Sequence, residues 1–401
     1  MNVLHITPTF YPATYWGGPI YSVYGLCNAL VKIPTVTLKV LTTDASSPRR
    51  GDSVKTSDFP MPYPEGYNVY FCRRWWGDSV SPTMFVHLWP MIRWADVVHL
   101  TAVYSPPTIP TLLVCRLLGK PVVWSPRGAL QRWEGSTKPM PKRAWERFCN
   151  ALITPNKCKL HVTSKQEAVE SEVRILKAHA TIIPNGVEIP ASLPPREWLP
   201  DGRLRILYIG RLHPKKGIEN LIRALAILKD ETVTLTICGS GDTAYLGSLQ
   251  KLTHQLLLDR CVFFAGHVDG ENKVRAFMLA DLCIVPSFTE NFGMVVAEAL
   301  AHAVPVIVSQ GTPWAEVETR DCGLWVNNSP DNLASAICCI RKMTLPEMGK
   351  RGREWMKNDF SWACIAEMMF SVYSRLVISS RKSAVDTDHP IVRTKVDKHS
   401  A

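Results

Sequence analysis

Short runs of apolar and β-branched residues alternate along the chain with segments long enough to form helices. The runs favour buried strands, and the segments between them repeat apolar residues at helical spacing. Regular alternation of strand and helix predicts parallel sheets with helices on both faces. In the first half of the chain we predict strands at residues 3–7, 36–43, 97–100, 121–125 and 159–164.

A proline-rich stretch at residues 184–202 interrupts the alternation and predicts a linker between two domains. We therefore predict an α/β fold of two Rossmann-like, doubly wound parallel-sheet domains that face a central cleft, with ligands bound where the strands end. The predicted units are residues 1–195, residues 196–360, a C-terminal helix at 361–378 that packs back on the first domain, and a flexible polar tail at 379–401. In the second unit the predicted strands are 204–210, 232–239, 261–266, 281–287 and 305–309, and the predicted helices are 218–228, 246–257, 273–279, one from Gly293, and 332–343.

Composition places the chain among soluble globular proteins, because 46% of its 401 residues are hydrophobic and 20% are charged. It has no uninterrupted apolar window of membrane-spanning length. The N-terminus lacks the basic and apolar regions of a secretion signal, so we expect a cytoplasmic protein. The 12 cysteines include no CxxC pair, which favours buried free thiols over a zinc or redox site.

The formal net charge is +11, and most of the excess belongs to residues 1–200, which carry 22 Lys and Arg against 13 Asp and Glu. It is densest at residues 116–147, where Trp133 and Trp145 lie among the charges and Phe148 follows. This mixture suits an anionic membrane surface or another phosphate-rich partner, although a solvated basic face would look the same. We expect peripheral association with the inner face of the cytoplasmic membrane. The basic residues of this stretch are Arg116, Lys120, Arg127, Arg132, Lys138, Lys142, Arg143 and Arg147, against Glu134 and Glu146.

The loop GRLHPKKG at residues 210–217 follows the first predicted strand of the second domain. Its cations, Arg211, Lys215 and Lys216, suit a diphosphate, since Arg can bridge two oxygens and Lys adds a point charge. A solvated basic turn is the alternative. The loop is not a P-loop, because GxxxxGK[ST] is absent.

The segment SFTENFGMVVAEAL at residues 287–300 carries two glutamates, Glu290 and Glu298, between a predicted strand and a predicted helix. A helix that starts at Gly293 offers free backbone N–H groups to an anion. Glu298 lies in an otherwise apolar helix, where an unpaired carboxylate is costly, so it must reach solvent, a partner or a ligand. A carboxylate is also a good acceptor for vicinal sugar hydroxyls.

These motifs, together with ICGSGD, FAGHV and CGLWV, resemble the C-terminal domain of the retaining nucleotide-sugar glycosyltransferases of family 4, which have the GT-B fold. The first half is similar in its GGP loop at 17–19, SPRGAL at 125–130, TSKQE at 163–167 and IPNGVE at 183–188. The resemblance covers about residues 1–377 and is most specific in the Glu-x7-Glu region. It implies a hexosyltransferase of surface polysaccharide or lipopolysaccharide synthesis, with a glycan or lipid-linked acceptor bound by the first domain.

The resemblance also implies roles for single residues. The catalytic group would be Arg211 and Lys216, which hold the donor diphosphate, and Glu290, which contacts the donor sugar. Glu298 would bind the ribose of a UDP- or GDP-sugar, and no metal or other cofactor is expected. The remaining donor-binding residues would be Gly17, Gly18, Asn291, Phe292, Gly293 and Met294.

The chain departs from the family where a strand often ends in His-x-His, because it has His99 but Thr101 in the second place. We therefore do not assign the sugar-site role to His99, which is expected to pack at a strand end. Thr101 is a candidate hydrogen-bond donor to the sugar or acceptor. Arg127 is a second candidate there, with a structural salt bridge as its alternative.

Three other classes of protein compete with this assignment. A nicotinamide oxidoreductase is suggested by Gly-x-Gly-x-x-Ala at residues 239–244, but the next predicted strand ends in Ala265 and Gly266, where an acidic residue is expected. A nucleotide-sugar epimerase or a phosphorylase would use a similar fold. A non-enzymatic polyanion-binding protein is suggested only by the charge, and the absence of RRM, KH and zinc motifs argues against a nucleic-acid partner.

Overall fold

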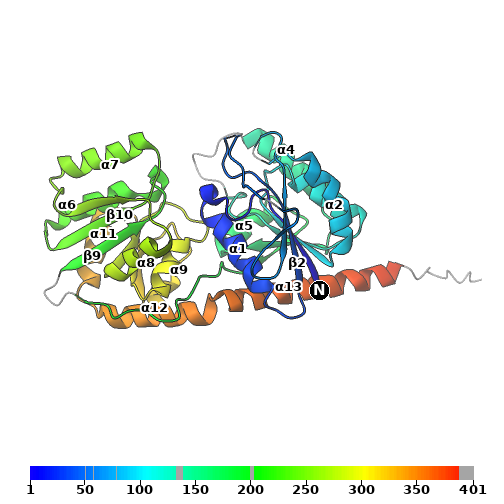
Figure 1. Ribbon diagram of the computed structural model, residues 1–401. Helices are drawn as coiled ribbons and strands as arrows, with labels where there is room; N and C mark the ends of the chain where they lie inside the picture. The colour runs from blue at the N-terminus through cyan, green and yellow to red at the C-terminus, as the bar shows by residue number, and fades with distance from the viewer. Residues whose placement is uncertain (50, 57, 78, 132–138, 199–202, 388–401) are drawn as a thin grey trace, which may run out of the picture.

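The computed structural model describes residues 1–49, 51–56, 58–77, 79–131, 139–198 and 203–387. They form two α/β domains that lie side by side, the first on the right and the second on the left of Figure 1. A sheet of eight strands forms the centre of the first domain and a sheet of six strands that of the second. Apolar clusters cover both faces of each sheet. The predicted α/β class with two parallel-sheet domains is confirmed.

The first sheet has the strand order β3-β4-β2-β1-β5-β6-β7-β8, and its pairs are parallel except β3 with β4. The order reverses between β1 and β5, which opens a crevice at their carboxyl ends. The strands are β1 (Asn2–Ile6), β2 (Thr37–Thr43), β3 (Met61–Pro62), β4 (Asn68–Cys72), β5 (Val97–Thr101), β6 (Val122–Ser125), β7 (Cys158–Val162) and β8 (His179–Ile182). The helices are η1 (Thr14–Trp16), α1 (Gly18–Leu30), α2 (Pro82–Trp94), α3 (Thr108–Leu117), α4 (Pro139–Leu152) and α5 (Lys165–Glu172).

The second sheet has the order β11-β10-β9-β12-β13-β14 and is parallel throughout. Its order reverses between β9 and β12, so the loops after these strands lie beside each other. The strands are β9 (Leu204–Ile209), β10 (Val233–Cys238), β11 (Val262–Gly266), β12 (Leu282–Val285), β13 (Val306–Ser309) and β14 (Gly323–Val326). The helices are η2 (Pro214–Lys216), α6 (Ile218–Leu228), α7 (Thr243–Gln255), α8 (Gly270–Leu279), α9 (Met294–Ala301), α10 (Glu316–Thr319), α11 (Pro330–Ile340) and α12 (Leu345–Asp359).

Some elements carry too little local pattern to be found in the sequence. Four strands, β3, β4, β8 and β14, were not predicted, and all of them lie at or next to the edges of the sheets. Short edge strands bury little apolar surface and therefore have a weak hydrophobic period. Helix α12 was also missed, because most of its residues are polar and only a narrow face, with Met348, Trp355 and Met356, is buried.

The last helix, α13 (Trp362–Thr387), returns from the second domain to the first and runs along the lower edge of the first domain in Figure 1, whereas α12 lies along the lower edge of the second. Ile365, Met369 and Tyr373 enter the apolar cluster between α1 and the first sheet. The helix runs beyond the predicted end at residue 378, so the predicted tail at 379–401 is wrong in its first part. No glycine or proline interrupts residues 378–387. Residues 388–401 lie outside the described residues.

Two further expectations concern buried free cysteines and a membrane-spanning segment. All 12 cysteines are free thiols, and Cys338 and Cys339 are exposed rather than buried as expected. Among the helices of the described residues, none has both the length and the hydropathy needed to span a bilayer.

Candidate functional site

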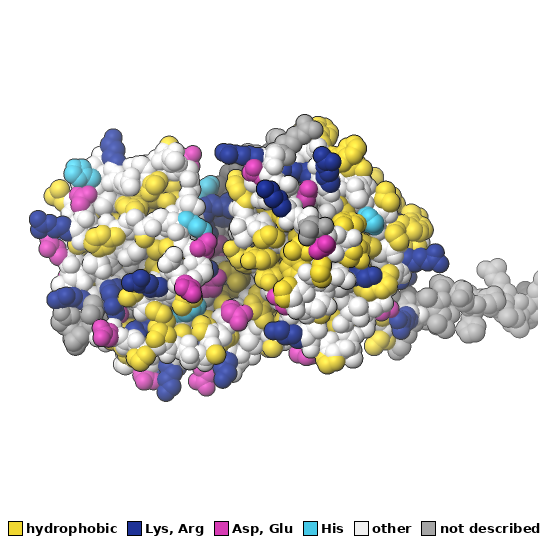
Figure 2. All heavy atoms as spheres, viewed as in Figure 1, with side chains coloured by type: hydrophobic (Ala, Val, Ile, Leu, Met, Phe, Trp, Pro, Cys, Tyr) yellow, Lys and Arg dark blue, Asp and Glu magenta, His cyan; other side chains and the backbone are white. Residues whose placement is uncertain are grey.

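A cavity of about 540 Å³ lies between the two domains, at the points where both sheets reverse their strand order. Figure 2, which is viewed from the same side as Figure 1, shows a hollow between the two lobes. The first domain contributes the start of α1 and the loop after β6, and the second contributes the loops after β9 and β12. The predicted site residues in its lining are Gly17, Gly18, Arg127, Arg211, Lys216, Glu290, Asn291, Phe292, Gly293 and Met294.

The basic loop after β9 packs tightly against the loop after β12. Gly217 has φ +65°, and a Cβ built on it would lie 2.1 Å from the carbonyl oxygen of Pro286. The amide of Phe288 donates to the carbonyl of Lys215 at 2.9 Å. A glycine is therefore required at 217, both for the left-handed conformation and for the close approach.

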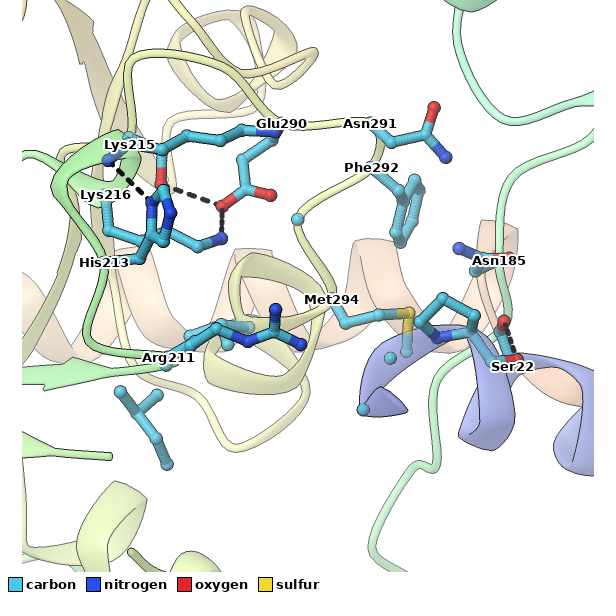
Figure 3. Close-up of a pocket in the computed structure, with 18 of the residues that line it drawn as sticks. Ser22, Asn185, Arg211, His213, Lys215, Lys216, Glu290, Asn291, Phe292 and Met294 are labelled. Atoms are coloured by element: carbon cyan, nitrogen blue, oxygen red, sulfur yellow. Dashed lines mark hydrogen bonds and ion pairs between the residues drawn. The ribbon is translucent and has the colours of Figure 1, made fainter. Parts of the chain in front are cut away.

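This packing brings three polar side chains together on the second-domain side of the cavity (Figure 3). The Lys216 ammonium donates to the Glu290 carboxylate, and both side chains are mostly buried. Ser287 Oγ donates to the same carboxylate at 2.8 Å. Burial lowers the pKa of the neighbouring Lys215, which the Glu290 carboxylate partly offsets. Arg211 is exposed and extends into the cavity.

Helix α9 begins at the cavity without a side-chain cap. Gly293 has φ +82° and precedes the first helical residue, Met294. Uncapped N–H groups and the positive end of the helix dipole favour an anion at this position. Together with Arg211 and Lys216, this helix start forms a cationic wall suited to a diphosphate.

Glu298 lies outside this cavity. It lines a neighbouring hollow of about 470 Å³ between α1, α8 and α9, and Met294 lines both spaces. Its Oε1 accepts from Lys273 Nζ at 2.6 Å. Its Oε2 is buried and has no hydrogen-bond partner among the described residues. One carboxylate oxygen of Glu298 is therefore unpartnered beside the second hollow.

The start of α1 faces the second domain and leaves room for a ligand. Gly17 has φ +69°, and a Cβ built on it would meet nothing within 4 Å. A Cβ on Gly18 would come no closer than 4.0 Å to Met294 Cγ. Positive φ explains the glycine at 17, whereas the open space beside both residues is where a ligand can approach the backbone.

The glycines that suggested a nicotinamide fingerprint have a structural role. A Cβ on Gly239 would lie 1.8 Å from the carbonyl oxygen of Gly210, and one on Gly241 would lie 2.1 Å from that of Leu212. Both residues therefore let the loop after β10 pack against the basic loop. The described residues also contain no group of three or more His, Cys, Asp or Glu side chains that could hold a metal ion.

Residues 193–355 match the family model of the glycosyl transferases group 1. This segment spans β9 to β14 and holds the basic loop, Glu290 and Glu298. The match is confined to the second domain and its adjoining segments and covers less than half of the chain.

Two curated relatives of the chain are glycosyltransferases by name. An uncharacterized glycosyltransferase of Methanocaldococcus jannaschii is 35% identical over 43% of this chain and 45% of its own length. A GDP-mannose-dependent alpha-(1-6)-phosphatidylinositol dimannoside mannosyltransferase of Mycobacterium tuberculosis is 26% identical over 63% of this chain and 67% of its own length. The matched region thus covers less than half of the length of the first of these relatives and about two thirds of the length of the second.

The two-domain arrangement occurs in solved structures as well. The structure of Anabaena HepE in complex with UDP has a TM-score of 0.70 and 15% sequence identity, over 94% of this chain and 100% of that one. At this identity the likeness concerns the fold, which is the GT-B fold that the resemblance implied.

One predicted donor-binding residue of the second domain turns toward the first domain. With its amide oriented to satisfy its neighbours, Asn291 donates to the Glu167 carboxylate at 2.9 Å and to Gln131 Oε1 at 3.0 Å. Glu167 is fully buried and also accepts from the amides of Gly128 at 2.6 Å and Thr163 at 2.7 Å. Asn291 thus joins the domains. The sequence analysis missed Glu167, although TSKQE was among its motifs.

The two candidates at the end of β5 are buried in the first domain. Thr101 Oγ1 pairs with His5 Nε2 at 2.9 Å, and among the described residues it is not part of the cavity lining. His99 has no exposed surface and bonds to Tyr373 and Ser125. Neither side chain reaches the cavity in this conformation.

Proposed function

We propose that the protein is a retaining hexosyltransferase of family 4 that moves a sugar from a nucleotide diphosphate sugar to a glycan or lipid-linked acceptor in surface polysaccharide or lipopolysaccharide synthesis. The observation that carries the proposal is the cationic wall of Arg211, Lys216 and the start of α9, next to Glu290 in the cleft between the domains. Such a wall stabilises the charge that develops on a departing diphosphate.

Several of the predicted residues have a role in this reaction. Arg211 and Lys216 hold the diphosphate, and Glu290, already in contact with Lys216, orients the donor sugar. The free Oε2 of Glu298 accepts from the ribose hydroxyls, which places the nucleoside in the second hollow and the phosphates beside Met294. Gly17 and Gly18, on the first-domain side of the cleft, let the phosphates lie close to the backbone. Thr101 would need to exchange its bond to His5 before it could reach a substrate.

The test is a thermal-shift screen of the purified protein against UDP- and GDP-sugars. A ligand at 100 times its Kd should stabilise the folded protein by about 2.7 kcal/mol. Stabilisation by a nucleotide sugar, with transfer of its sugar to an acceptor extract, is the expected result. No shift with any nucleotide sugar would contradict the proposal.

Sugar transfer is expected to continue without a divalent metal. The cationic side chains of Arg211 and Lys216 and the start of α9 supply the positive charge that a metal ion would otherwise give to the diphosphate. Turnover measured after dialysis against EDTA should equal turnover before it. Lost activity that magnesium or manganese restores would show a metal requirement.

The product is expected to keep the anomeric configuration of the donor sugar. The Glu290 carboxylate is held by Lys216 and Ser287, which leaves it poorly placed as a nucleophile and favours direct transfer with the donor phosphate taking the acceptor proton. NMR of the product, before anomeric equilibration, measures the configuration. An inverted product would rule out the retaining mechanism.

We also propose that the first domain binds an anionic membrane on the cytoplasmic side. In the basic stretch, helix α4 supports this proposal, because its side chains Arg143, Arg147, Met140 and Phe148 are exposed. Other members have partners of their own: Arg116 donates to the carbonyl of Ala151, Lys120 to those of Arg93 and Ala95, and Trp145 to that of Val103. Arg132, Trp133, Glu134 and Lys138 lie outside the described residues.

The double variant Arg143→Gln with Arg147→Gln should bind anionic liposomes about 30-fold more weakly than the unmodified protein, since each basic residue contributes about 1 kcal/mol near such a surface. Co-sedimentation with anionic and neutral vesicles measures this. The matched control is Lys229→Gln with Lys251→Gln, two exposed lysines of the second domain. Equal binding to both kinds of vesicle, or no binding at low salt, would exclude the membrane proposal and would favour a soluble acceptor.

A further inference from the structure

A row of polar side chains crosses the first sheet at the carboxyl ends of β1, β5, β6 and β7. It consists of His5, His99, Ser125 and His161, all at most 4% exposed. His5 and His99 are register partners on adjacent strands, and their rings stack 4.4 Å apart. Below this row the same face of the sheet is apolar and belongs to the cluster that contains α1 and α13. Such a polar layer inside a domain is stable only if its hydrogen bonds are satisfied.

The hydrogen bonds of this row have one consistent direction. The carbonyl of Ile183 can only accept, so His161 Nε2 donates to it at 3.1 Å. The other nitrogen of a neutral His161 must then accept from Ser125 Oγ, at 2.7 Å. Ser125 in turn accepts from His99 Nε2 at 2.6 Å, which leaves His99 Nδ1 to accept from the Tyr373 hydroxyl at 2.5 Å. Both ring nitrogens of His99 and His161 and the Ser125 hydroxyl are therefore engaged in hydrogen bonds.

The three histidines of the row are neutral, and the ring nitrogen of each that could accept a further hydrogen bond is already engaged. Burial lowers the pKa of His5 to about 3 and holds the pKa values of His99 and His161 well below their usual range, with the Arg127 charge adding to each effect. His5 already pairs with Thr101 through Nε2 and lies 3.6 Å from the Cys27 thiol through Nδ1. The row therefore cannot compensate a neighbouring positive charge.

Arg127 lies in the loop after β6 with φ +54°, and it lines the cavity between the domains. Its guanidinium donates to Asn185 Oδ1 at 2.5 Å, a neutral acceptor. Its Nε is buried and has no hydrogen-bond partner among the described residues. Burial lowers the pKa of Arg127 to about 10, so the group is still a cation at neutral pH.

Glu167 is the carboxylate that interacts electrostatically with Arg127. Its oxygens already accept hydrogen bonds from the amides of Gly128 and Thr163 and from the Thr163 hydroxyl. No hydrogen bond between Glu167 and Arg127 is among these contacts. A largely desolvated cation without a bonded counter-charge is costly, and a ligand anion would relieve that cost. Arg127 belongs to the first-domain wall, whereas the cations assigned to the donor diphosphate belong to the second domain.

We propose that Arg127 is a specificity-determining residue that binds an anionic substituent, a carboxylate or a phosphate group, carried by the transferred sugar or by the acceptor. The inference rests on the proposed function, because it takes the cleft as the place where donor and acceptor meet. An anion in the cavity beside Arg127 would give the guanidinium a bonded counter-charge, so the site would discriminate against neutral analogues.

The experiment measures binding by calorimetry in two arms. In the acceptor arm, the protein saturated with UDP or GDP, whichever binds, is titrated with glucuronate, glucose 6-phosphate and neutral glucose. In the donor arm, UDP-glucuronic acid is compared with UDP-glucose. Each titration is made on the unmodified protein, on Arg127→Gln and Arg127→Lys, and on Arg93→Gln as an exposed control in α2.

We expect the unmodified protein to prefer the anionic compound in one arm by about ten- to a hundredfold, the range for a hydrogen bond to a charged group. Arg127→Gln should abolish the preference, Arg127→Lys should retain part of it, and Arg93→Gln should leave it unchanged. Nucleotide affinity should be the same in all variants, which shows that they fold.

The results separate the two proposals. Failure of the unmodified protein to bind any nucleotide would overturn the proposed function and, with it, the role of Arg127. Nucleotide binding with no preference for an anionic compound in either arm would overturn only the role of Arg127. A preference that survives in Arg127→Gln would have the same meaning, because another group would then hold the anion.

Discussion

Replacing Lys216 by alanine is expected to lower kcat by about 10²–10³ while the fold is retained. Lys216 contacts Glu290 and lies in the loop beside the start of α9, where the diphosphate would gain negative charge as the sugar departs. Loss of one such electrostatic contact typically costs about 10²–10³ in rate. Steady-state kinetics with the donor identified by the screen measures the effect, and thermal melting measures the fold.

Arg211→Ala is expected to behave in the same way, because Arg211 extends into the cavity from the same loop (Figure 3). Lys251→Ala is the matched control, since Lys251 is an exposed lysine of α7 in the same domain. Its turnover should equal that of the unmodified protein. Nearly normal kcat in both loop variants would remove the loop from the mechanism.

Gly217→Ala is expected to destabilise the second domain and to abolish most turnover. The new methyl group would lie 2.1 Å from the Pro286 carbonyl oxygen, and the residue would keep φ +65° only under strain. Overpacking costs about 1–3 kcal/mol and a left-handed L-residue about 1–2 kcal/mol more. The two loops would have to separate, and Lys216 would move away from Glu290. Chemical denaturation and kinetics on the same preparation measure both effects.

The control is Gly247→Ala in α7, where an added Cβ meets nothing within 4 Å and φ is not positive. In a helix this exchange should stabilise the protein by about 0.5–1 kcal/mol. Equal stability changes at 217 and 247 would show that the contact with Pro286 does not constrain the loop.

The sequence by itself determined the architecture and about half of the residues that line the cleft. Strand and helix periods are local properties, so the strands from residues 204 to 309 could be placed to within a few residues, and their parallel order follows from the alternation. Glycines and cations at strand ends could be recognised for the same reason, because carboxyl ends of parallel strands share one edge of a sheet. All ten predicted residues that line the cavity lie in loops after strands or at the starts of the helices that follow, three of them in the first domain and seven in the second.

Only the tertiary structure decided which of these groups meet. The contact between Lys216 and Glu290 joins positions 74 residues apart, and it exists because β9 and β12 are neighbours in the sheet. Packing separated Glu298 into a second hollow and turned Asn291 toward Glu167. It also buried Thr101 against His5, and it left Arg127 without a bonded carboxylate. Hydrogen bonding and desolvation depend on neighbours distant in sequence, which no local period encodes.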